Sequence, residues 1–236
     1  MFHFTLVRYA PILLVVQLLS ACSSGAGAIV DTATAVVGRY RGGIDSVPLN
    51  PQFRYLRVTV DGRPAFMALG YEDAGPDGIT EVWYSAEREV LRLRAGRLVG
   101  ATGLTREWRE VFLPPLPSWQ SLAISSGLKW VRTRDLMPGY RFGVVDELHL
   151  IRVPAPARSE LRGLDPGSLA WFQERVTGGS YRGGGVMDAP LAPALYAVDL
   201  STGEGVVQYA EQCLASDLCI TWQRWSAQQQ SAAVPR

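Results

Sequence analysis

The sequence is poor in the residues on which metal and nucleophilic chemistry most often depend. It holds two histidines in 236 residues, His3 and His149. Since a multi-histidine metal site needs several imidazoles, none is expected here. A Ser–His–Asp or Cys–His arrangement would rest on His149 alone, which lies in the alternating run 144–153 and is interpreted as an ordinary strand residue. We therefore predict no catalytic residue, no metal and no cofactor.

Lysine is also scarce, because Lys129 is the one lysine of the chain, and neither sign of charge is in excess. The formal net charge is +1, from 23 basic and 22 acidic side chains. Removal of the first 21 residues would take away Arg8 and leave the two signs equal. A balanced charge argues against binding nucleic acid or an anionic surface through bulk charge.

The chain lacks an apolar run long enough to span a bilayer. Its first apolar segment, residues 10–19, has half of the roughly 20 residues that a spanning helix needs. The segment follows Arg8, as the h-region of a secretory signal peptide follows its basic residue. It ends in Leu19-Ser20-Ala21-Cys22, which resembles the bacterial lipobox. An ordinary signal peptide or a signal anchor is the alternative.

The lipobox resemblance implies that residues 1–21 are removed and that Cys22 becomes the first residue. Its thiol would carry diacylglycerol and its amine a further acyl chain, such as palmitate. Because three chains bury many methylene groups, such an anchor is close to permanent. The residue after Cys22 is Ser23 and not Asp. The resemblance therefore implies sorting to the outer membrane, with the protein facing the periplasm.

The two remaining cysteines support an exported protein. Cys213 and Cys219 are separated by five residues in C-L-A-S-D-L-C. Because exported chains enter a disulfide-forming compartment, a pair is expected between them. A thioredoxin-like site would have C-x-x-C, and a zinc site would need more ligands.

Short alternating runs separated by turn residues dominate the chain and predict an all-β fold. The runs around Asp61-Gly62 predict a hairpin, because that pair favours a tight turn with positive φ. Residues 196–200 and 205–209 predict a second hairpin. We expect an antiparallel meander, either barrel-like or a sandwich, with few short helices. Exposed edge strands would then be available for docking by strand addition.

The expected domains are a signal peptide at 1–21, a lipidated N-terminus and tether at 22–45, and one all-β domain at 46–236. An alternative division of that domain into two sub-halves falls near residue 154, where prolines cluster. The segment Leu169–Val176 fits either a strand or a short helix. The glycine-rich run 178–185 lacks the Lys-Ser/Thr pair of a phosphate loop and is interpreted as a flexible connection.

Tryptophans and paired carboxylates are the remaining candidates for a site. Trp108 and Trp119 lie near the proline-rich segment 114–117, where their rings would be exposed for contact with a glycan or a partner. Most tryptophans are packed in the core, however. A glycosidase needs two carboxylates across a cleft. The neighbours Glu107 and Glu110, and Asp146 and Glu147, are candidates that solvated strand faces also explain.

Three blocks resemble one known family. They are L-N-P-Q-F-R-Y-L-R-V-T-V-D-G-R-P-A (49–65), E-V-W-Y-S-A-E-R-E-V-L-R-L-R-A-G-R (81–97) and Y-A-E-Q-C-L-A-S-D-L-C-I-T-W-Q-R-W (209–225). They are similar to the YjbF/GfcB family of group 4 capsule polysaccharide lipoproteins. The last block is the most specific, since it joins the cysteine pair to T-W-Q-R-W. The family has no established catalytic residues to transfer.

The resemblance implies an outer-membrane lipoprotein that serves assembly or export of a capsule or exopolysaccharide. Its partners would be membrane lipid, an outer-membrane barrel protein, a periplasmic protein of the same system and the polysaccharide itself. We expect a non-enzymatic accessory. The alternatives are a periplasmic glycan-processing enzyme that uses paired carboxylates, and a purely structural lipoprotein.

Overall fold

A computed structural model describes residues 44–183 and 191–226 of the chain. These residues form twelve strands, one short α-helix and two 3-10 helices. The strands are β1 (Tyr55–Val60), β2 (Arg63–Gly75), β3 (Gly78–Ser85), β4 (Val90–Arg94), β5 (Arg97–Thr102), β6 (Glu107–Phe112), β7 (Leu128–Met137), β8 (Arg141–Val153), β9 (Ala170–Ser180), β10 (Ala194–Asp199), β11 (Val206–Ala215) and β12 (Leu218–Trp225). The helices are η2 (Ile44–Ser46), α3 (Trp119–Ala123) and η3 (Pro166–Ser168).

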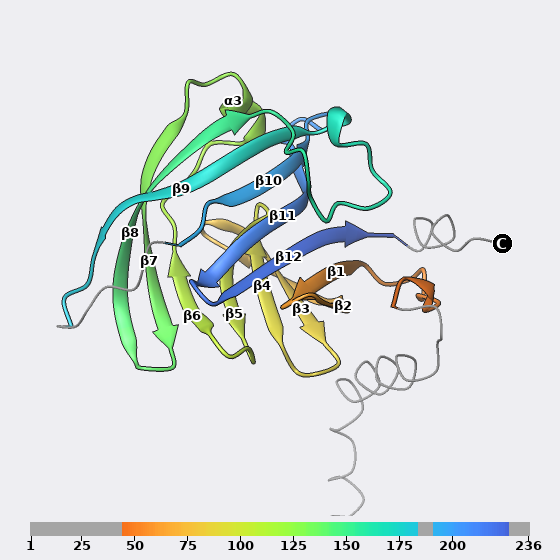
Figure 1. The fold of residues 1–236 in the computed structure, drawn as a ribbon, viewed down its shortest axis with the longest axis horizontal. Helices are drawn as coiled ribbons and strands as arrows, with labels where there is room; N and C mark the ends of the chain where they lie inside the picture. The colour runs from red at the N-terminus through yellow and green to blue at the C-terminus, as the bar shows by residue number, and fades with distance from the viewer. Residues whose placement is uncertain (1–43, 184–190, 227–236) are drawn as a thin grey trace, which may run out of the picture. The chain divides into compact units, whose positions relative to one another are not determined.

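The strands follow one another around a closed antiparallel barrel (Figure 1). Each strand pairs with its neighbours in the sequence, and β1 closes the ring by pairing with β12 from Tyr55 opposite Trp225 to Val60 opposite Ile220. The prediction of an all-β meander is confirmed, and the barrel rather than the sandwich is correct. Among the described residues, no helix combines the length and the apolar character that crossing a membrane requires.

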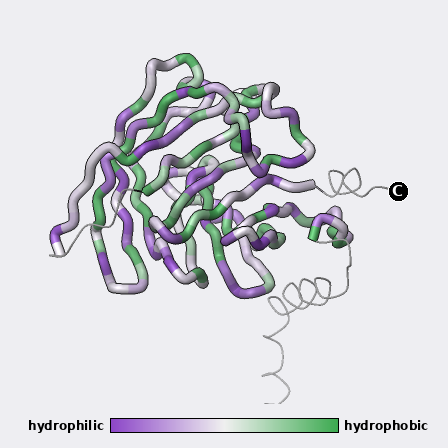
Figure 2. Tube along the Cα trace, viewed as in Figure 1, coloured by the Kyte–Doolittle hydropathy of each residue, from purple (hydrophilic) through white to green (hydrophobic). Residues whose placement is uncertain are grey.

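Period-two alternation directs the core into the barrel. Along β7 the side chains of Trp130, Arg132, Arg134 and Leu136 are buried, while those between them are more exposed. Hydrophobic and hydrophilic residues alternate in the same way along other strands (Figure 2). One large cluster of apolar side chains, drawn from all twelve strands and α3, therefore fills the interior.

The predicted hairpins are confirmed. Asp61 and Gly62 have φ of 49° and 74° at the β1–β2 turn, the two positive values that a type I′ turn requires. The β10–β11 hairpin also forms where it was predicted. Leu169–Val176 proves to be strand, because Ala170 begins β9, and inward-facing Phe172 and Glu174 pack inside the barrel.

Two expectations about loops and edges are wrong. The glycine-rich run does not begin as a flexible connection, because its residues 178–180 end β9 and pair with β8. No described strand is an edge strand, because closure gives each one two neighbours. The sequence could not show closure, which depends on β1 meeting β12 from the far end of the chain.

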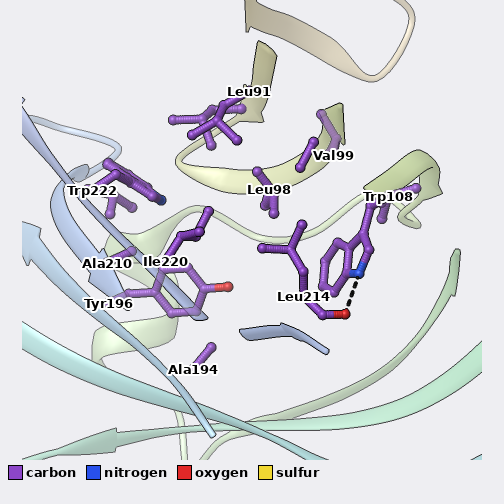
Figure 3. Packing of buried hydrophobic residues seen from close by; sticks show 14 of the residues in the cluster. Leu91, Leu98, Val99, Trp108, Ala194, Tyr196, Ala210, Leu214, Ile220 and Trp222 are labelled. Atoms are coloured by element: carbon purple, nitrogen blue, oxygen red, sulfur yellow. Dashed lines mark hydrogen bonds between the residues drawn. The ribbon is translucent and has the colours of Figure 1, made fainter. Parts of the chain in front are cut away.

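Opposite walls of the barrel touch one another, so the interior is closed by packing. The indole Nε1 of Trp108 in β6 donates a hydrogen bond of 2.9 Å to the carbonyl oxygen of Leu214 in β11 (Figure 3). A Cβ added to Gly96, in the β4–β5 turn, would lie 2.3 Å from a methyl carbon of Val207 in β11. These strands are far apart in the strand order, and their contact leaves no room for a wide lumen.

Two loops cover the ends and the outside of the barrel. The β6–β7 connection carries α3, whose backbone reaches the β10–β11 turn through a hydrogen bond from Gln120 N to Glu204 O. The β8–β9 connection lies on the outer wall, where Glu160 N donates to the hydroxyl of Tyr209. Beneath it, Trp171 and Tyr209 form a second, smaller apolar cluster outside the barrel.

Candidate functional site

Trp108 and Trp119, the tryptophans predicted to be exposed, are buried instead. Their exposed fractions are 0% and 2%. The Trp119 indole donates to the carbonyl oxygen of Ala95 at 2.8 Å, so both rings have their N–H groups bound to backbone inside the fold. The expectation of exposed rings is wrong because α3 turns Trp119 inward and β6 points Trp108 at the opposite wall. Neither ring is open to a glycan on the surface.

A buried network of charged side chains occupies the interior beside β7, β8 and β9. Asp146 accepts hydrogen bonds from Arg134 at 2.6 and 2.8 Å and from Arg132 at 2.9 Å. Arg132 also donates to Glu174 at 3.3 Å. Both guanidinium carbons lie 4.6 Å from the ring centre of Trp108. Cross-strand register produces this arrangement, since Arg132 lies directly opposite Asp146.

The pKa values of the two buried carboxyl groups are shifted in opposite directions, although the arginines act in the same sense on both. Burial by itself raises the pKa of Asp146, but hydrogen bonds from Arg134 and Arg132 and their charges outweigh burial and hold the pKa below its usual value. Burial prevails at Glu174 and raises its pKa, although Arg132 and Arg97 oppose the shift. The network thus holds Asp146 as a carboxylate bound by both arginines, unlike the general acid of a glycosidase.

Arg97 adds a third buried guanidinium near the end of the barrel that α3 covers. Its guanidinium carbon lies 3.9 Å from the ring centre of Trp119, in contact with the ring. Within the described part of the chain, its Nε and Nη2 atoms have no hydrogen-bond partner. Burial lowers the pKa of Arg97, and the nearby Tyr196 and Glu174 oppose that shift. Arg97 therefore extends the positive side of the network toward α3.

The candidate carboxylate pairs do not form a catalytic arrangement. Asp146 points into the barrel, whereas Glu147 is exposed on the outer face of the same strand. Glu107 accepts from the backbone N of Gly103 at 2.8 Å, and Glu110 pairs with Arg92 at 3.1 Å. Neighbours in sequence thus have different partners, and neither pair faces across a cleft.

The predicted disulfide is confirmed between Cys213 and Cys219. The two residues lie directly opposite each other on β11 and β12, beside a register shift that ends at Ala215. The bond closes a short loop, which contributes about 2 kcal/mol in the chain-entropy model. Its position on a tight hairpin makes it a structural staple of the wall that closes the barrel.

A surface pocket of about 360 Å³ lies beside this hairpin, between the β1–β2 and β11–β12 turns. Asp61, Glu160 and Asp217 line it together with hydroxyl groups such as that of Thr221. Thr221 donates to Glu160 at 3.0 Å, and a hydrogen bond from Arg106 lowers the pKa of Asp217. The acidic lining repels an anionic ligand. Among the described residues, no group of His, Cys, Asp or Glu is arranged to hold a metal ion.

His149 and Cys22 are the remaining residues about which the sequence made a prediction. His149 lies on β8, as predicted, and its side chain is half-buried on the outer face. Cys22, the predicted lipid attachment point, lies outside the described residues, as do the predicted signal peptide and most of the tether.

Sequence reasoning missed the interior network, although its signal was present. Arg132 and Arg134 share the period-two face of Trp130 and Leu136, and that face is the core. Alternation therefore assigned two arginines to the interior, where charges need partners. Their partners Asp146 and Glu174 come from other strands, so only tertiary structure supplies them.

Comparison with known proteins identifies a family and a related fold. The chain covers 97% of a structure described as that of the hypothetical lipoprotein YmcC from Escherichia coli (K12), over 84% of its own length, with a TM-score of 0.58 and 18% sequence identity. At this identity the likeness shows a shared fold. No curated protein sequence matches the chain.

The family comparison rests on sequence and covers much of the barrel. Residues 50–164 match the model of a family described as group 4 capsule polysaccharide lipoprotein gfcB, YjbF. The matched range includes the block 81–97 and all but the first residue of the block 49–65, whereas the block 209–225 lies outside it. The resemblance is thereby confirmed: residues 50–164 match the YjbF family of group 4 capsule polysaccharide lipoproteins.

Proposed function

We propose that this protein is a non-enzymatic outer-membrane lipoprotein that assists assembly or export of a capsule or exopolysaccharide. The match of residues 50–164 to a capsule polysaccharide lipoprotein family carries the proposal. Cys22 would hold the lipid, and the barrel would face the periplasm. It would work beside an outer-membrane barrel protein and a periplasmic partner of the same system.

Tethering explains how a domain without catalytic machinery contributes. Confinement to a thin layer at the membrane raises the effective concentration of the barrel near membrane partners. Contacts that are weak in free solution then suffice. Since the barrel is closed, these contacts would use side chains on its walls and turns rather than addition of a strand to a free edge.

Two features support an accessory rather than an enzyme. Asp146 and Glu174 are buried and share Arg132 as a partner, so neither faces a substrate-sized cleft. The surface pocket has carboxylates, but Glu160 is bound by Thr221 and Asp217 by Arg106. A direct check is to incubate the protein with the polysaccharide of its host and measure reducing ends, which we expect not to increase.

The first prediction concerns the lipid anchor. In the native gene, Cys22→Ala should reduce surface polysaccharide strongly, because the barrel is no longer acylated and retained at the outer membrane. A second variant replaces residues 1–21 with a cleavable secretory leader and also carries Cys22→Ala, so that the barrel is released into the periplasm. Surface polysaccharide is measured by extraction and a total-carbohydrate assay, together with the amount of protein.

Ser24→Ala, which keeps the cysteine, is the matched control and should leave export unchanged. Normal surface polysaccharide in both cysteine variants, at normal protein levels, would remove the tether from the proposal. Mass spectrometry of the N-terminal peptide of the natural protein tests the acylation itself. An unmodified Cys22 would contradict it.

A further inference from the structure

The one lysine of the chain, one of its two histidines and an arginine meet on one outer face of the barrel. In the register of the sheet, Lys129 of β7 lies directly opposite His149 of β8. His149 in turn lies directly opposite Arg175 of β9. The three residues, here called the basic row, come from adjacent strands (Figure 1). With strands spaced about 4.8 Å apart, Lys129 and Arg175 are about 10 Å apart across the sheet.

The side chains of the basic row point outward and are not neutralised. Lys129 and Arg175 are exposed and His149 is half-buried. Within the described residues, Lys129 and His149 have no hydrogen bond or ion pair, and Arg175 donates only to the neutral side chain of Gln173 at 2.6 Å. Without a charged partner among the described residues, the two cations and the imidazole between them are available to a ligand.

The surroundings of the row restrict its positive field to a narrow strip. On one side along β8 lies Glu147, whose exposed carboxylate shares the outer face. On the other side lie Ile151 and Gln173, which are paired and uncharged. A broad anionic bilayer would bring phosphates against Glu147 as well as against the row. A single extended chain with spaced carboxylates can contact the row and avoid Glu147.

We propose that the basic row binds an acidic polysaccharide chain through its carboxylate groups. Lys129 and Arg175 supply two positive charges, and His149 between them supplies a ring N–H donor. The inference rests on the proposed function, which provides the polymer, and deepens it by naming the contact and the ligand class. The pocket beside the disulfide is a poor competitor because its carboxylates repel an anion.

The second prediction tests the row with defined oligomers. The full chain, purified in detergent, is titrated with alginate oligosaccharides and with dextran oligosaccharides of equal length by isothermal titration calorimetry. We expect weak binding of alginate that salt reduces, and no binding of dextran. The double variant Lys129→Gln, Arg175→Gln should weaken alginate binding roughly tenfold, as two exposed ion pairs would. His149→Gln should weaken it less.

A charge-matched control separates the row from general charge. Arg63→Gln together with Arg158→Gln removes two exposed arginines that are in no ion pair among the described residues. This control should bind alginate as the wild type does. An equal loss in both double variants, or no alginate binding by the wild type, would overturn the proposal. Circular dichroism of each variant confirms that the barrel is folded.

Anionic vesicles form the last arm of the experiment. Binding to phosphatidylglycerol vesicles that depends on the row, without binding to alginate, would overturn the proposal in favour of a membrane contact. Failure here is distinct from failure of the proposed function. If the cysteine variants lose export but the wild-type protein binds no alginate, the proposed function stands and only the polysaccharide contact at the basic row is rejected.

Discussion

Arg132 and Asp146 show how single residues acquire their roles in this barrel. Each sits on a strand whose alternation directs it inward, and each would be costly to bury alone. Together with Arg134 and Glu174 they form a network in which every charge has a partner. Such a network adds little net stability over an apolar core, but breaking one member leaves the others uncompensated.

The third prediction follows from that asymmetry. Asp146→Asn should lower the free energy of unfolding at pH 7 by about 3–5 kcal/mol, because Arg132 and Arg134 lose their shared charge partner. Urea unfolding followed by tryptophan fluorescence measures the loss. Glu147→Gln, on the outer face of the same strand, is the control and should change the free energy by about 0.5 kcal/mol or less.

The loss of stability caused by Asp146→Asn should also depend on pH. The pKa of Asp146 in the folded protein lies below its usual value, so its carboxylate stabilises the fold above the unfolded pKa of about 3.9. That contribution is lost as the pH falls through the folded pKa. The gap between wild type and Asp146→Asn should therefore be full at pH 7 and shrink below about pH 4. A gap that stays constant in acid would contradict the assignment.

At the scale of elements, turns decide how closely the walls of the barrel approach. The β4–β5 turn contains Ala95 and Gly96, with φ of 47° and 72°, and it lies against Val207 of β11. The β1–β2 turn contains Asp61 and Gly62 with similar angles, but open space surrounds Gly62. Equal turn chemistry thus occurs in two different packing environments.

The fourth prediction compares these two turns. Gly62→Ala should cost about 1 kcal/mol, which is the strain of placing a Cβ at positive φ. Gly96→Ala carries the same strain and also a clash with Val207, so it should cost about 2–4 kcal/mol. Thermal and urea unfolding measure both. Adding Val207→Gly to Gly96→Ala tests the clash, because it removes both Val207 carbons that the new Cβ would meet, Cγ2 at 2.3 Å and Cβ at 2.4 Å. In that background Val207→Gly should cost less than it does alone. Equal losses in the two glycine variants would contradict this reasoning.

At the scale of the whole barrel, closure is uneven. β7, β8 and β9 pair along extended ladders, from Leu128 opposite Leu150 and from Val145 opposite Ser180. The β5–β6 seam rests on a single residue pair, Ala101 with Trp108. The indole of Trp108 also reaches β11, so one residue joins this seam to the opposite wall.

The fifth prediction is that the barrel opens first at the β5–β6 seam. Local opening requires fewer backbone hydrogen bonds to break there than along β8, so its amides should exchange with solvent sooner. Hydrogen exchange followed by mass spectrometry should show residues 98–112 deuterated before residues 144–152. Trp108→Phe should widen the difference, because it removes the hydrogen bond to Leu214. Uniform protection around the barrel would show that closure does not depend on this seam.

The basic row is likewise a property of the whole barrel. The chain is close to neutral, so no argument from net charge predicts an anion site. Its residues stand at positions 129, 149 and 175 and meet only because β7, β8 and β9 are adjacent and in register. The basic row arises because the fold brings basic side chains together, although the chain as a whole has almost no net charge.

Elements with strong local signals could be predicted from the sequence. Alternation gave the all-β class, Asp61-Gly62 gave its hairpin, and the close spacing of Cys213 and Cys219 gave the disulfide. These depend on backbone angles and contacts over a few residues, which neighbouring side chains set. The lipobox at Cys22 likewise remains a local prediction.

Tertiary structure alone decided barrel closure, the burial of Trp108 and Trp119, the interior ion network and the basic row. Each depends on which strands meet and on the register in which they pair. A strand's own residues show which face is apolar, but not what lies across the barrel from it. The physical reason is that long-range pairing is fixed by the packing of the entire core, and no short stretch of sequence contains it.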